Sequence, residues 1–416
     1  MSPSGRPRAD LLPRKILLLR LRRLGDVILT TPAVTLLKRS FPAASLTYLV
    51  EEPFRRLVEG NPHLDRVLAV PAKQSASELF AFIRSIRREK YDVLLDFHGG
   101  PRASWITLLG GAKLKVGYAI KGKGFLYDIR VPRSGEHGPV HSVENHANLV
   151  KALTRDIRPD EYDEAAAAPP LLLPEPTAAE KARVQALLAE AFGTSPSSPG
   201  HSSAEISRGP SAREPDPQAR LEAPALGILH VGAGNRFRDW GAENLAALAS
   251  RLVRDAKAKV ALIGAEGDRA VEEHVLASLG AAAAHTRPWI VGHGRVRRNM
   301  IPGQSPGAPA AVLPCCGRLN LMETRELIRR ASLFAGPDSG PMHLAASTPT
   351  PIVAWFGPTL PANFAPWRPD ECRTVILERA LSCRPCEQRA CAAIDFRCLQ
   401  AISPDDVFES CRPFLL

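Results

Sequence analysis

The sequence predicts an α/β protein made of two domains, each with a parallel β-sheet flanked by helices. Short, fully apolar segments alternate with amphipathic ones from Ile16 onward, which is typical of buried parallel strands joined by helices. This alternation stops in a Ser/Pro-rich stretch at 194–223, which has the composition of a disordered insert or linker. It resumes at Leu226. We therefore expect two Rossmann-like halves facing each other across a cleft.

The composition is that of a folded protein with an anionic partner. Hydrophobic residues make up 45% of the 416 residues, which excludes wholesale disorder. The 54 Lys and Arg exceed the 43 Asp and Glu by 11, which favours nucleic acid, anionic lipid or a phosphorylated substrate. No apolar stretch reaches the ~20 residues of a membrane span, and no signal-peptide core is present. With only eight cysteines, the expected compartment is the cytoplasm.

Apolar runs and helical periodicity define the elements of the first half. The clearest helix covers 77–90, where Leu79, Phe82, Ile83 and Ile86 share one face. The expected strands of this half are 16–19, 46–50, 67–70 and 93–97, and the expected helices are 25–40, 77–90 and 143–153.

The second half repeats the pattern around another low-complexity stretch, 281–314, which is rich in Ala, Pro and Gly. Strands are expected at 226–231, 260–263, 333–336 and 352–356, and helices at 242–254, 268–279, 323–331 and 342–347. The predicted organisation is a flexible tail (1–14), an N-terminal Rossmann-like domain (15–175), a helix with the disordered linker (176–223), and a C-terminal Rossmann-like domain (224–416) that carries the 281–314 insert and a cysteine-containing tail.

The first candidate for chemistry is the turn that contains Gly25 and Asp26, between the first strand and its helix. Glycine permits a tight turn and the close approach of a ligand. Asp26 then lies at the carboxyl edge of the sheet, where α/β proteins bind ligands. The alternative is structural, because aspartate is a favoured helix N-cap.

A second candidate is the Gly-rich loop that follows the strand at 226–231. Gly232, Ala233 and Gly234 offer backbone N–H groups that can surround a phosphate, and Arg238 adds a planar cation suited to phosphate. The loop lacks the Gly-Lys-Ser/Thr of a P-loop and a full Gly-x-Gly-x-x-Gly. A plain turn is the alternative.

The third candidate is the polar turn Gly336-Pro337-Asp338-Ser339-Gly340, which leads into an Ala-rich helix. Ser339 and the first-turn amides form an anion site there, assisted by the helix dipole. Asp338 either caps the helix or contacts the ligand, and His343 lies one turn inside. A lone histidine in such a place is more often a packed core residue than a catalyst.

Two further features remain ambiguous. Four cysteines, Cys383, Cys386, Cys391 and Cys398, have a spacing that could hold a structural zinc, although a second Cys-x2-Cys pair is missing; the alternative is a set of buried or partly paired thiols. The segment 1–40 has nine Lys or Arg and two acidic residues. It is either a solvated basic surface or one that faces anionic lipid or phosphate.

These motifs, in this order, resemble glycosyltransferase family 9, the ADP-heptose:lipopolysaccharide heptosyltransferases. The matching stretches are "KILLLRLRRLGDVILTTPAVTLLKRSFP", "HVGAGNRFRDWGAENLAALASRL", "GPDSGPMHLAASTPTPIVAWFGPT" and "CRPCEQRACAAIDFRCLQAISPDDV". The last of them is most similar to the heptosyltransferase II branch. The resemblance covers most of 15–410 and implies a GT-B fold. It also implies that the domain at 15–175 binds the acceptor and that the domain at 224–416 binds the ADP-sugar.

The resemblance also implies inverting transfer of a heptose from ADP-heptose to the inner core, made of Kdo and heptose, of lipopolysaccharide. Asp26 matches the catalytic aspartate, which takes a proton from the acceptor hydroxyl. Arg238 stands where the family has Lys, a departure that keeps the cation but changes its geometry. Arg20, Arg22 and Arg23 are expected to face the acceptor or the membrane. The residues expected to bind the donor are Gly25, Gly232, Ala233, Gly234, Arg238, Trp240, Glu266, Asp338, Ser339, Gly340 and His343.

The expected cofactor set is ADP-heptose as donor with no required metal, since Arg238 and helix-terminal amides can meet the leaving-group charge. We expect a monomer that binds the inner face of the cytoplasmic membrane peripherally and does not bind nucleic acid. Two alternatives stay open. One is a family 9 transferase that uses another nucleotide sugar or glycan acceptor, and the other is a nucleotide-sugar-binding relative without transfer activity.

Overall fold

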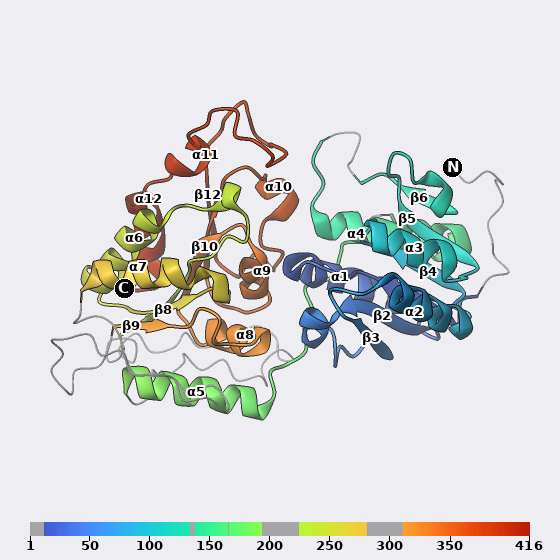
Figure 1. Ribbon diagram of the computed structural model, residues 1–416, viewed down its shortest axis with the longest axis horizontal. Helices are drawn as coiled ribbons and strands as arrows, with labels where there is room; N and C mark the ends of the chain where they lie inside the picture. The colour runs from blue at the N-terminus through green and yellow to red at the C-terminus, as the bar shows by residue number, and fades with distance from the viewer. Residues whose placement is uncertain (1–11, 134–137, 165, 194–223, 281–310) are drawn as a thin grey trace. The chain divides into compact units, whose positions relative to one another are not determined.

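A computed structural model describes residues 12–133, 138–164, 166–193, 224–280 and 311–416. The chain divides into two compact units (Figure 1). Unit 1 contains the residues up to Glu175 together with Pro361–Pro369, and unit 2 contains Pro176–Leu360 and Asp370–Leu416. Both low-complexity stretches, except for the last residues of the second, lie outside the described residues, as does most of the N-terminal tail.

Unit 1 is built on a six-stranded sheet in the order β3-β2-β1-β4-β5-β6. Every neighbouring pair is parallel. Its elements are β1 (Lys15–Leu19), α1 (Leu24–Ser40), β2 (Ser45–Glu51), η1 (Glu52–Leu57), β3 (Arg66–Val70), α2 (Ala76–Glu89), β4 (Val93–Asp96), α3 (Pro101–Leu109), β5 (Leu114–Tyr118), η2 (Gly124–Leu126), β6 (Ile129–Val131), α4 (Ser142–Ile157) and η3 (Pro159–Glu161).

Helices cover both faces of this sheet, which explains why its central strands are apolar throughout. One face packs against α2 and α3 through a cluster that includes Leu17, Ile83 and Ile106. Helices α1 and α4 pack against each other on the opposite face. The helix α2 begins at a capping box, in which Ser75 accepts a hydrogen bond from the Glu78 amide.

Unit 2 repeats the plan with a parallel sheet in the order β12-β11-β10-β7-β8-β9. Its elements are α5 (Ala178–Phe192), β7 (Leu226–His230), η5 (Arg236–Arg238), α6 (Ala242–Arg254), β8 (Lys259–Ile263), η6 (Glu266–Asp268), α7 (Arg269–Leu279), β9 (Val312–Pro314), α8 (Leu321–Arg329), β10 (Leu333–Pro337), α9 (Gly340–Ala346), β11 (Ile352–Phe356), β12 (Thr374–Glu378), α11 (Arg397–Gln400), α12 (Pro404–Cys411) and η7 (Arg412–Phe414).

The main core of unit 2 lies between the sheet and the helices α6, α7, α11 and α12. Two indoles lie near its centre, with the rings of Trp240 and Trp355 4.7 Å apart. The helices α5, α8 and α9 form a contiguous set, in which α8 packs against both others. No helix among the described residues is long and apolar enough to span a bilayer.

The segment Pro361–Pro369, which includes the short helix α10 (Pro361–Phe364), leaves unit 2 and packs in unit 1. Trp367 donates its indole N–H to the Pro169 carbonyl at 3.0 Å, and its ring lies 4.9 Å from that of His141. The amide of Asn363 donates to the Val140 carbonyl at 3.0 Å. Unit 1 therefore includes residues that follow most of unit 2 in the sequence.

The predicted fold class is confirmed, since both units contain a parallel sheet flanked by helices. Each strand and helix expected from the apolar pattern is present, with ends shifted by a few residues. Several were missed: α3, β5, β6, β9, β12 and α12. The expected insert 281–314 ends too late, because Val312–Pro314 form the edge strand β9.

Candidate active site

In each unit, a group of polar side chains lies where the strand order of the sheet reverses. This point is β1/β4 in unit 1 and β7/β10 in unit 2. At such a point the connections leave in opposite directions, so a crevice opens beyond the carboxyl ends of the two strands. The two groups are described separately below.

In unit 1, the loop between β1 and α1 places Arg20 against Asp26. A guanidinium nitrogen of Arg20 lies 2.5 Å from Asp26 Oδ2, and another donates to the carbonyl of Phe97, just after β4. The backbone N–H of Arg23 donates to the same Oδ2 at 3.3 Å. Arg20 is buried, whereas 28% of the Asp26 side chain is exposed. The alternative role of Asp26 as the helix N-cap is wrong, because Arg23 is the N-cap residue and Asp26 is the third residue of α1, where it accepts the Arg23 amide and is still reachable by a ligand.

The surroundings of Asp26 keep its carboxyl group ionised. Burial by itself raises the pKa, but the charge of Arg20 and the hydrogen bond from the Arg23 amide outweigh it, so the pKa lies below its ordinary value. Asp26 is also the third residue of α1, where the helix dipole favours a negative charge. At neutral pH this group can accept a proton.

A buried histidine lies close to this ion pair. His146, on α4, is fully buried, and its Nδ1 lies 2.6 Å from the Tyr118 hydroxyl. Burial lowers the His146 pKa to well below its ordinary value, and the charge of Arg20 lowers it further. The imidazole is therefore neutral. No hydrogen-bond partner of its Nε2 is present among the described residues.

Asp96, the last residue of β4, shapes the adjacent loop. Its carboxylate accepts hydrogen bonds from the amides of His98 and Gly99 at 2.8 and 2.9 Å and from the Tyr127 hydroxyl at 2.7 Å. The group is fully buried, and burial raises its pKa. Asp96 thus fixes the turn that carries His98.

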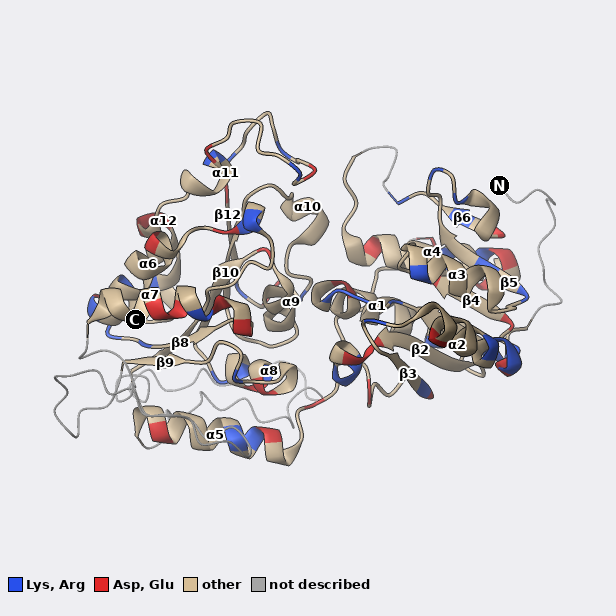
Figure 2. Cartoon of the chain, viewed as in Figure 1, with Lys and Arg blue, Asp and Glu red and all other residues tan. Residues whose placement is uncertain are grey.

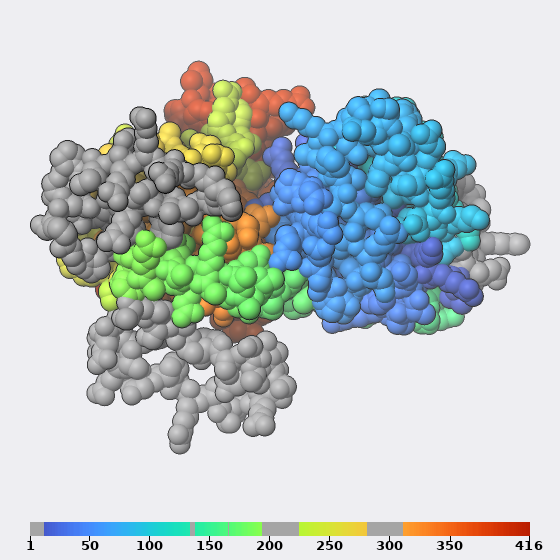
Figure 3. Space-filling model, turned by 60° about the horizontal axis from the view of Figure 1, so that its bottom comes forward, coloured from blue at the N-terminus to red at the C-terminus, as the bar shows by residue number. Residues whose placement is uncertain are grey.

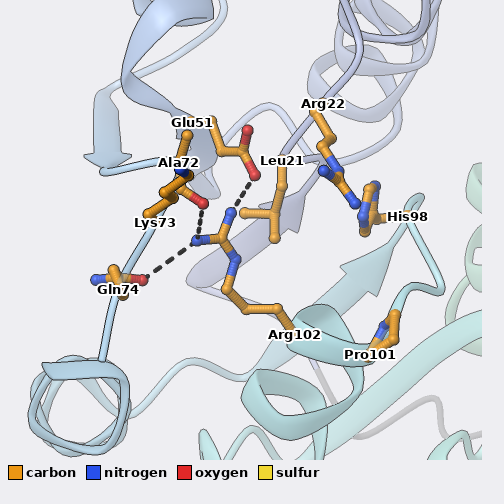
Figure 4. A pocket seen from close by; sticks show the side chains of 9 residues that line it. All are labelled: Leu21, Arg22, Glu51, Ala72, Lys73, Gln74, His98, Pro101 and Arg102. Carbon is orange, nitrogen blue, oxygen red and sulfur yellow. Dashed lines mark hydrogen bonds and ion pairs between the residues drawn. The ribbon is translucent and has the colours of Figure 1, made fainter. Parts of the chain in front are cut away.

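A pocket of about 300 Å³ opens beside this turn (Figure 4). Arg102 crosses it and pairs with the buried Glu51, and it also donates to the Pro71 carbonyl at 2.9 Å. Figure 4 shows the side chain of Arg22 beside the ring of His98. Burial and the nearby arginines lower the His98 pKa to about 4, so this ring is neutral. The lining residues are Leu21, Arg22, Glu51, Ala72, Lys73, Gln74, His98, Pro101 and Arg102.

In unit 2, an ion pair joins Arg238 and Asp338. Arg238 Nη1 lies 3.2 Å from Asp338 Oδ2 and also donates to the Asp338 carbonyl at 3.2 Å. Arg238 Nε donates to Gln388 Oε1 at 3.2 Å. The Thr359 hydroxyl donates to Asp338 Oδ2 at 2.6 Å. Asp338 is buried, while 26% of the Arg238 side chain is exposed, so the cation remains reachable.

Ser339 and His230 connect the ends of β7 and β10. Ser339 Oγ lies 3.1 Å from His230 Nδ1, and both residues are buried. Burial lowers the His230 pKa to about 3, so this histidine is neutral. Ser339 is the N-cap residue of α9, although its side chain makes no capping hydrogen bond. Asp338 precedes this cap, and its contacts with Arg238 and Thr359 replace the capping role considered for it.

The glycine loop after β7 has no room for side chains at one position. A Cβ on Gly232 would lie 2.0 Å from the Asp268 carboxylate, whereas Gly234 has a φ of +62°, which favours glycine. Ala233 lies between them. Glu266 follows the neighbouring strand β8, and 79% of its side chain is exposed, 3.5 Å from Arg269. The loop and Glu266 thus lie at the carboxyl edge of the same sheet.

Other predicted residues lie deeper. The Trp240 indole is buried and donates its N–H to the Ile402 carbonyl at 2.9 Å. His343 is buried within α9, next to Gly340 at the start of that helix. Gly25 is in the first turn of α1. The binding roles predicted for these residues stay predictions.

Two predictions about charge and metal need correction or restriction. Arg20 is 3% exposed and paired with Asp26, so it cannot face a membrane, whereas Arg22 and Arg23 are exposed. The described residues contain no group of three or more His, Cys, Asp or Glu side chains arranged to hold a metal ion. The four cysteines considered for a zinc site therefore form no such group in the structure. They are free thiols: Cys383, Cys386, Cys391 and Cys398.

Several residues of the site were missed in the sequence. Asp96 and His98 follow an apolar run and precede Gly99-Gly100, which is the same signal that identified Asp26. Glu51 likewise ends β2. His146 and Gln388 were not recognisable, because a helix and a loop distant in sequence bring them to the site.

Two parallel six-stranded sheets with helices on their faces define the GT-B fold. The chain belongs to glycosyltransferase family 9 (heptosyltransferase), whose family model matches residues 79–292 and 293–395.

Solved structures share the fold at low sequence identity. A glycosyltransferase family 9 protein from Veillonella parvula superposes with a TM-score of 0.70 at 19% identity, covering 97% of each chain. The ADP-heptose lipopolysaccharide heptosyltransferase II of E. coli has a TM-score of 0.67 at 18% identity, over 96% of this chain and 98% of that one.

Curated relatives match over shorter stretches. Lipooligosaccharide heptosyltransferase 2 of Campylobacter jejuni is 33% identical over 100 residues, which are 24% of this chain and 31% of the relative. Lipopolysaccharide heptosyltransferase 1 of Pseudomonas aeruginosa is 28% identical over 102 residues, 22% of this chain and 29% of the relative. These matches span about a third of the length of the curated relatives.

Proposed function

We propose that this protein is an inverting glycosyltransferase that moves a heptose from ADP-heptose to the inner core of lipopolysaccharide. The observation that carries the proposal is the ionised carboxylate of Asp26, held by the buried Arg20 at the strand-order reversal of unit 1. Membership of family 9 and the names of its relatives support the substrates.

In this mechanism Asp26 is the general base. The acceptor hydroxyl gives its proton to the Asp26 carboxylate while its oxygen attacks the anomeric carbon of the heptose. The new C–O bond forms as the bond to the β-phosphate of ADP breaks on the opposite face, so the configuration inverts. Arg20 holds Asp26 in place and lowers its pKa. It is a positioning residue, because it is buried behind the carboxylate.

The leaving group is ADP, which takes the electrons of the broken bond as negative charge on its diphosphate. Arg238 is the cation available in unit 2, and the amides of Gly232, Ala233 and Gly234 offer neutral donors. The pairing of Arg238 with Asp338 fixes the direction of the guanidinium before the donor arrives. This fixed fork compensates for the departure from the family Lys.

The pocket in unit 1 suits an anionic acceptor. It contains Arg22 and Lys73, both exposed, and lies next to the loop that carries Asp26. His98 is neutral there and can donate or accept a hydrogen bond. A carboxylate, as in a Kdo sugar, or a sugar phosphate fits such a lining. We place the acceptor here, and assign the chain to the heptosyltransferase II branch, at the cytoplasmic face of the membrane.

The direct test is transfer in vitro. Purified protein is incubated with ADP-heptose and a panel of truncated lipopolysaccharide acceptors, and both ADP release and the anomeric configuration of the product are measured. We expect release that depends on one acceptor, with inversion. Turnover with another nucleotide sugar but not with ADP-heptose would favour the other family 9 activities, and binding of ADP-heptose without turnover by any acceptor would favour a non-catalytic relative.

A further inference from the structure

Exposed apolar side chains gather on one surface of unit 1. The largest exposures are 74% for Phe125, 49% for Trp105 and 45% for Phe80, and Leu108 is 40% exposed. Only three other large apolar side chains among the described residues are this exposed, namely Leu12, Ile394 and Leu416. We call Phe80, Trp105, Leu108 and Phe125 the aromatic face.

The aromatic face belongs to one packed layer. The rings of Phe80 on α2 and Trp105 on α3 lie 6.4 Å apart, edge to face. Leu108 follows Trp105 by nearly one turn on the same side of α3. The helix α3 also packs against η2, which carries Phe125. Phe80, Trp105 and Leu108 therefore lie on the two helices that cover one face of the sheet, and Phe125 lies on an element that contacts α3.

The segments that carry the aromatic face are rich in basic residues. Residues 71–90 contain five Lys or Arg and two acidic residues, and residues 101–130 contain six and one. The acids are already engaged, since Glu78 caps α2, Glu89 pairs with Arg66 at 2.9 Å and Asp128 accepts from the Lys115 amide. Figure 2 shows basic residues on α2, and the light-blue and cyan surface of Figure 3 is the continuous face formed by this part of the chain.

We propose that unit 1 docks on an anionic lipid bilayer through the aromatic face. Aromatic rings suit the headgroup region, where one side is apolar and the other is wet. The exposed basic side chains of the same segments, including Arg84, Arg88 and Lys121, bind the phosphates of anionic lipids. Large exposed rings within a strongly basic surface match such a bilayer in both chemistry and charge.

The docking surface adjoins the pocket of unit 1. Pro101 and Arg102 line the pocket at the start of α3, one turn before Trp105, and Lys73 and Gln74 line it just before α2 begins. A glycolipid anchored in the bilayer would thus present its sugars next to the pocket. This inference deepens the proposed function, although membrane binding can be measured without donor or transfer.

The first experiment measures partitioning of the full chain onto phosphatidylcholine vesicles with and without phosphatidylglycerol. We expect strong binding to the anionic vesicles. The variant Trp105→Ser/Phe125→Ser should lower the partition coefficient by about tenfold or more, because binding scales with buried apolar area. The matched control is Ile394→Ser, which removes an apolar side chain that is 85% exposed in unit 2 and should change nothing.

The charged rim is tested separately. Arg84→Gln/Lys121→Gln should weaken binding by about fivefold for each residue, and more salt should reduce this difference. Arg254→Gln/Lys257→Gln, on the exposed surface of unit 2, is the matched control. Unchanged melting temperatures would show that each variant is folded.

Fluorescence reports the depth of the contact. Brominated lipids should quench the wild-type protein more than Trp105→Phe, which keeps an apolar ring and should still bind. Equal vesicle binding by wild type and Trp105→Ser/Phe125→Ser would overturn the proposal. The proposal would also be overturned if Trp105→Ser/Phe125→Ser lost self-association, or binding to another protein, while its vesicle binding stayed unchanged. The double variant should transfer to a water-soluble acceptor as fast as the wild type does. Absence of transfer by both proteins would therefore count against the proposed function and not against membrane docking.

Discussion

The guanidinium of Arg20 and Oδ2 of Asp26 are 2.5 Å apart, but only the carboxylate is open to solvent. Arg20 is also held by the carbonyl of Phe97, so the positive charge stays in a fixed position behind the carboxylate. An anion that approaches Asp26 therefore reaches the negative carboxylate first and is repelled by it, because the positive charge of Arg20 lies behind. Such an arrangement favours a neutral hydroxyl as the group that binds there.

Substitution of Asp26 tests the base. Asp26→Asn and Asp26→Ala should lower kcat by about 10²–10⁴-fold, because neither side chain accepts the acceptor's proton. Asp26→Asn retains an oxygen that can accept the Arg23 amide, so the melting temperature should fall by only a few degrees. Asp255→Asn, at an exposed helix end in unit 2, is the control. A near-normal kcat in both Asp26 variants would limit Asp26 to a structural role in the first turn of α1.

Substitution of Arg20 tests the positioning role through pH. The charge of Arg20 lowers the Asp26 pKa, so Arg20→Gln should raise it and move the acidic limb of the kcat profile to higher pH. Arg20→Lys retains a charge and should restore most of the wild-type profile. A limb that stays in place in Arg20→Gln would show that Arg20 is purely structural.

Arg238 distinguishes charge from geometry. Arg238→Ala removes the cation and should reduce kcat by about 10²–10³-fold, as for other groups that stabilise a developing anion. Arg238→Lys keeps a point charge but loses the simultaneous contacts with Asp338 and Gln388, so we expect an intermediate loss and a higher KM for the donor. Steady-state kinetics with varied donor measures both values. Exposed Arg236→Ala, two residues away, is the control, and an equal loss in that variant would argue against a specific role of Arg238.

His230 should make stability depend on pH. Its pKa is about 3 in the folded protein, against an ordinary value of 6.5 in an unfolded chain, so below pH 6.5 the unfolded chain binds a proton that the folded chain does not. The free energy of unfolding should then fall between pH 6.5 and about 3, by up to about 1.4 kcal/mol per pH unit for this group. Urea denaturation of wild type and His230→Gln at several pH values measures the difference. Identical slopes for the two proteins would contradict the prediction.

The cysteines should fall into two classes of reactivity. Burial raises the pKa values of Cys315, Cys316 and Cys411, so these thiols should react with a maleimide only after unfolding. Cys383 is exposed and should react at once. Mass spectrometry after timed labelling identifies each site. Protection of Cys383 that is lost after treatment with a chelator would instead favour a bound metal at the cysteine-containing tail.

Apolar patterning was enough to predict the parallel strands at the centre of each sheet, since these are buried on both faces. It missed β5, β6, β9 and β12. The strand β5 includes Lys115 and Gly117 and β6 has three residues, so neither has a long continuous apolar run, and β12 is only half-buried. The helix α8 begins at Leu321, because the side-chain oxygen of Asn320 caps it by accepting hydrogen bonds from the amides of Met322 and Glu323 in its first turn. The expected start of α8 overlooked this cap.

The candidate site was predictable where a polar residue lies in the connection between a buried strand and the next helix. Asp26, in the first turn of α1, and Asp338, directly after β10, both satisfy this rule. Partners from other parts of the chain were not predictable. The sequence does not show that Arg20 points inward to Asp26, because arginine is usually exposed. Nor does it show that Gln388, 150 residues away, would bind Arg238.

The packing of Pro361–Pro369 in unit 1 has a consequence for folding during synthesis. Phe364 and Trp367 pack against a core cluster of unit 1 that contains Leu29, Val143 and Ala147. A ribosome synthesises these two aromatic residues only after most of unit 2. The N-terminal domain of a nascent chain usually folds first, but here its last packing contacts have to wait. During that interval, the surface of α1 and α4 that will receive Trp367 is open to chaperones.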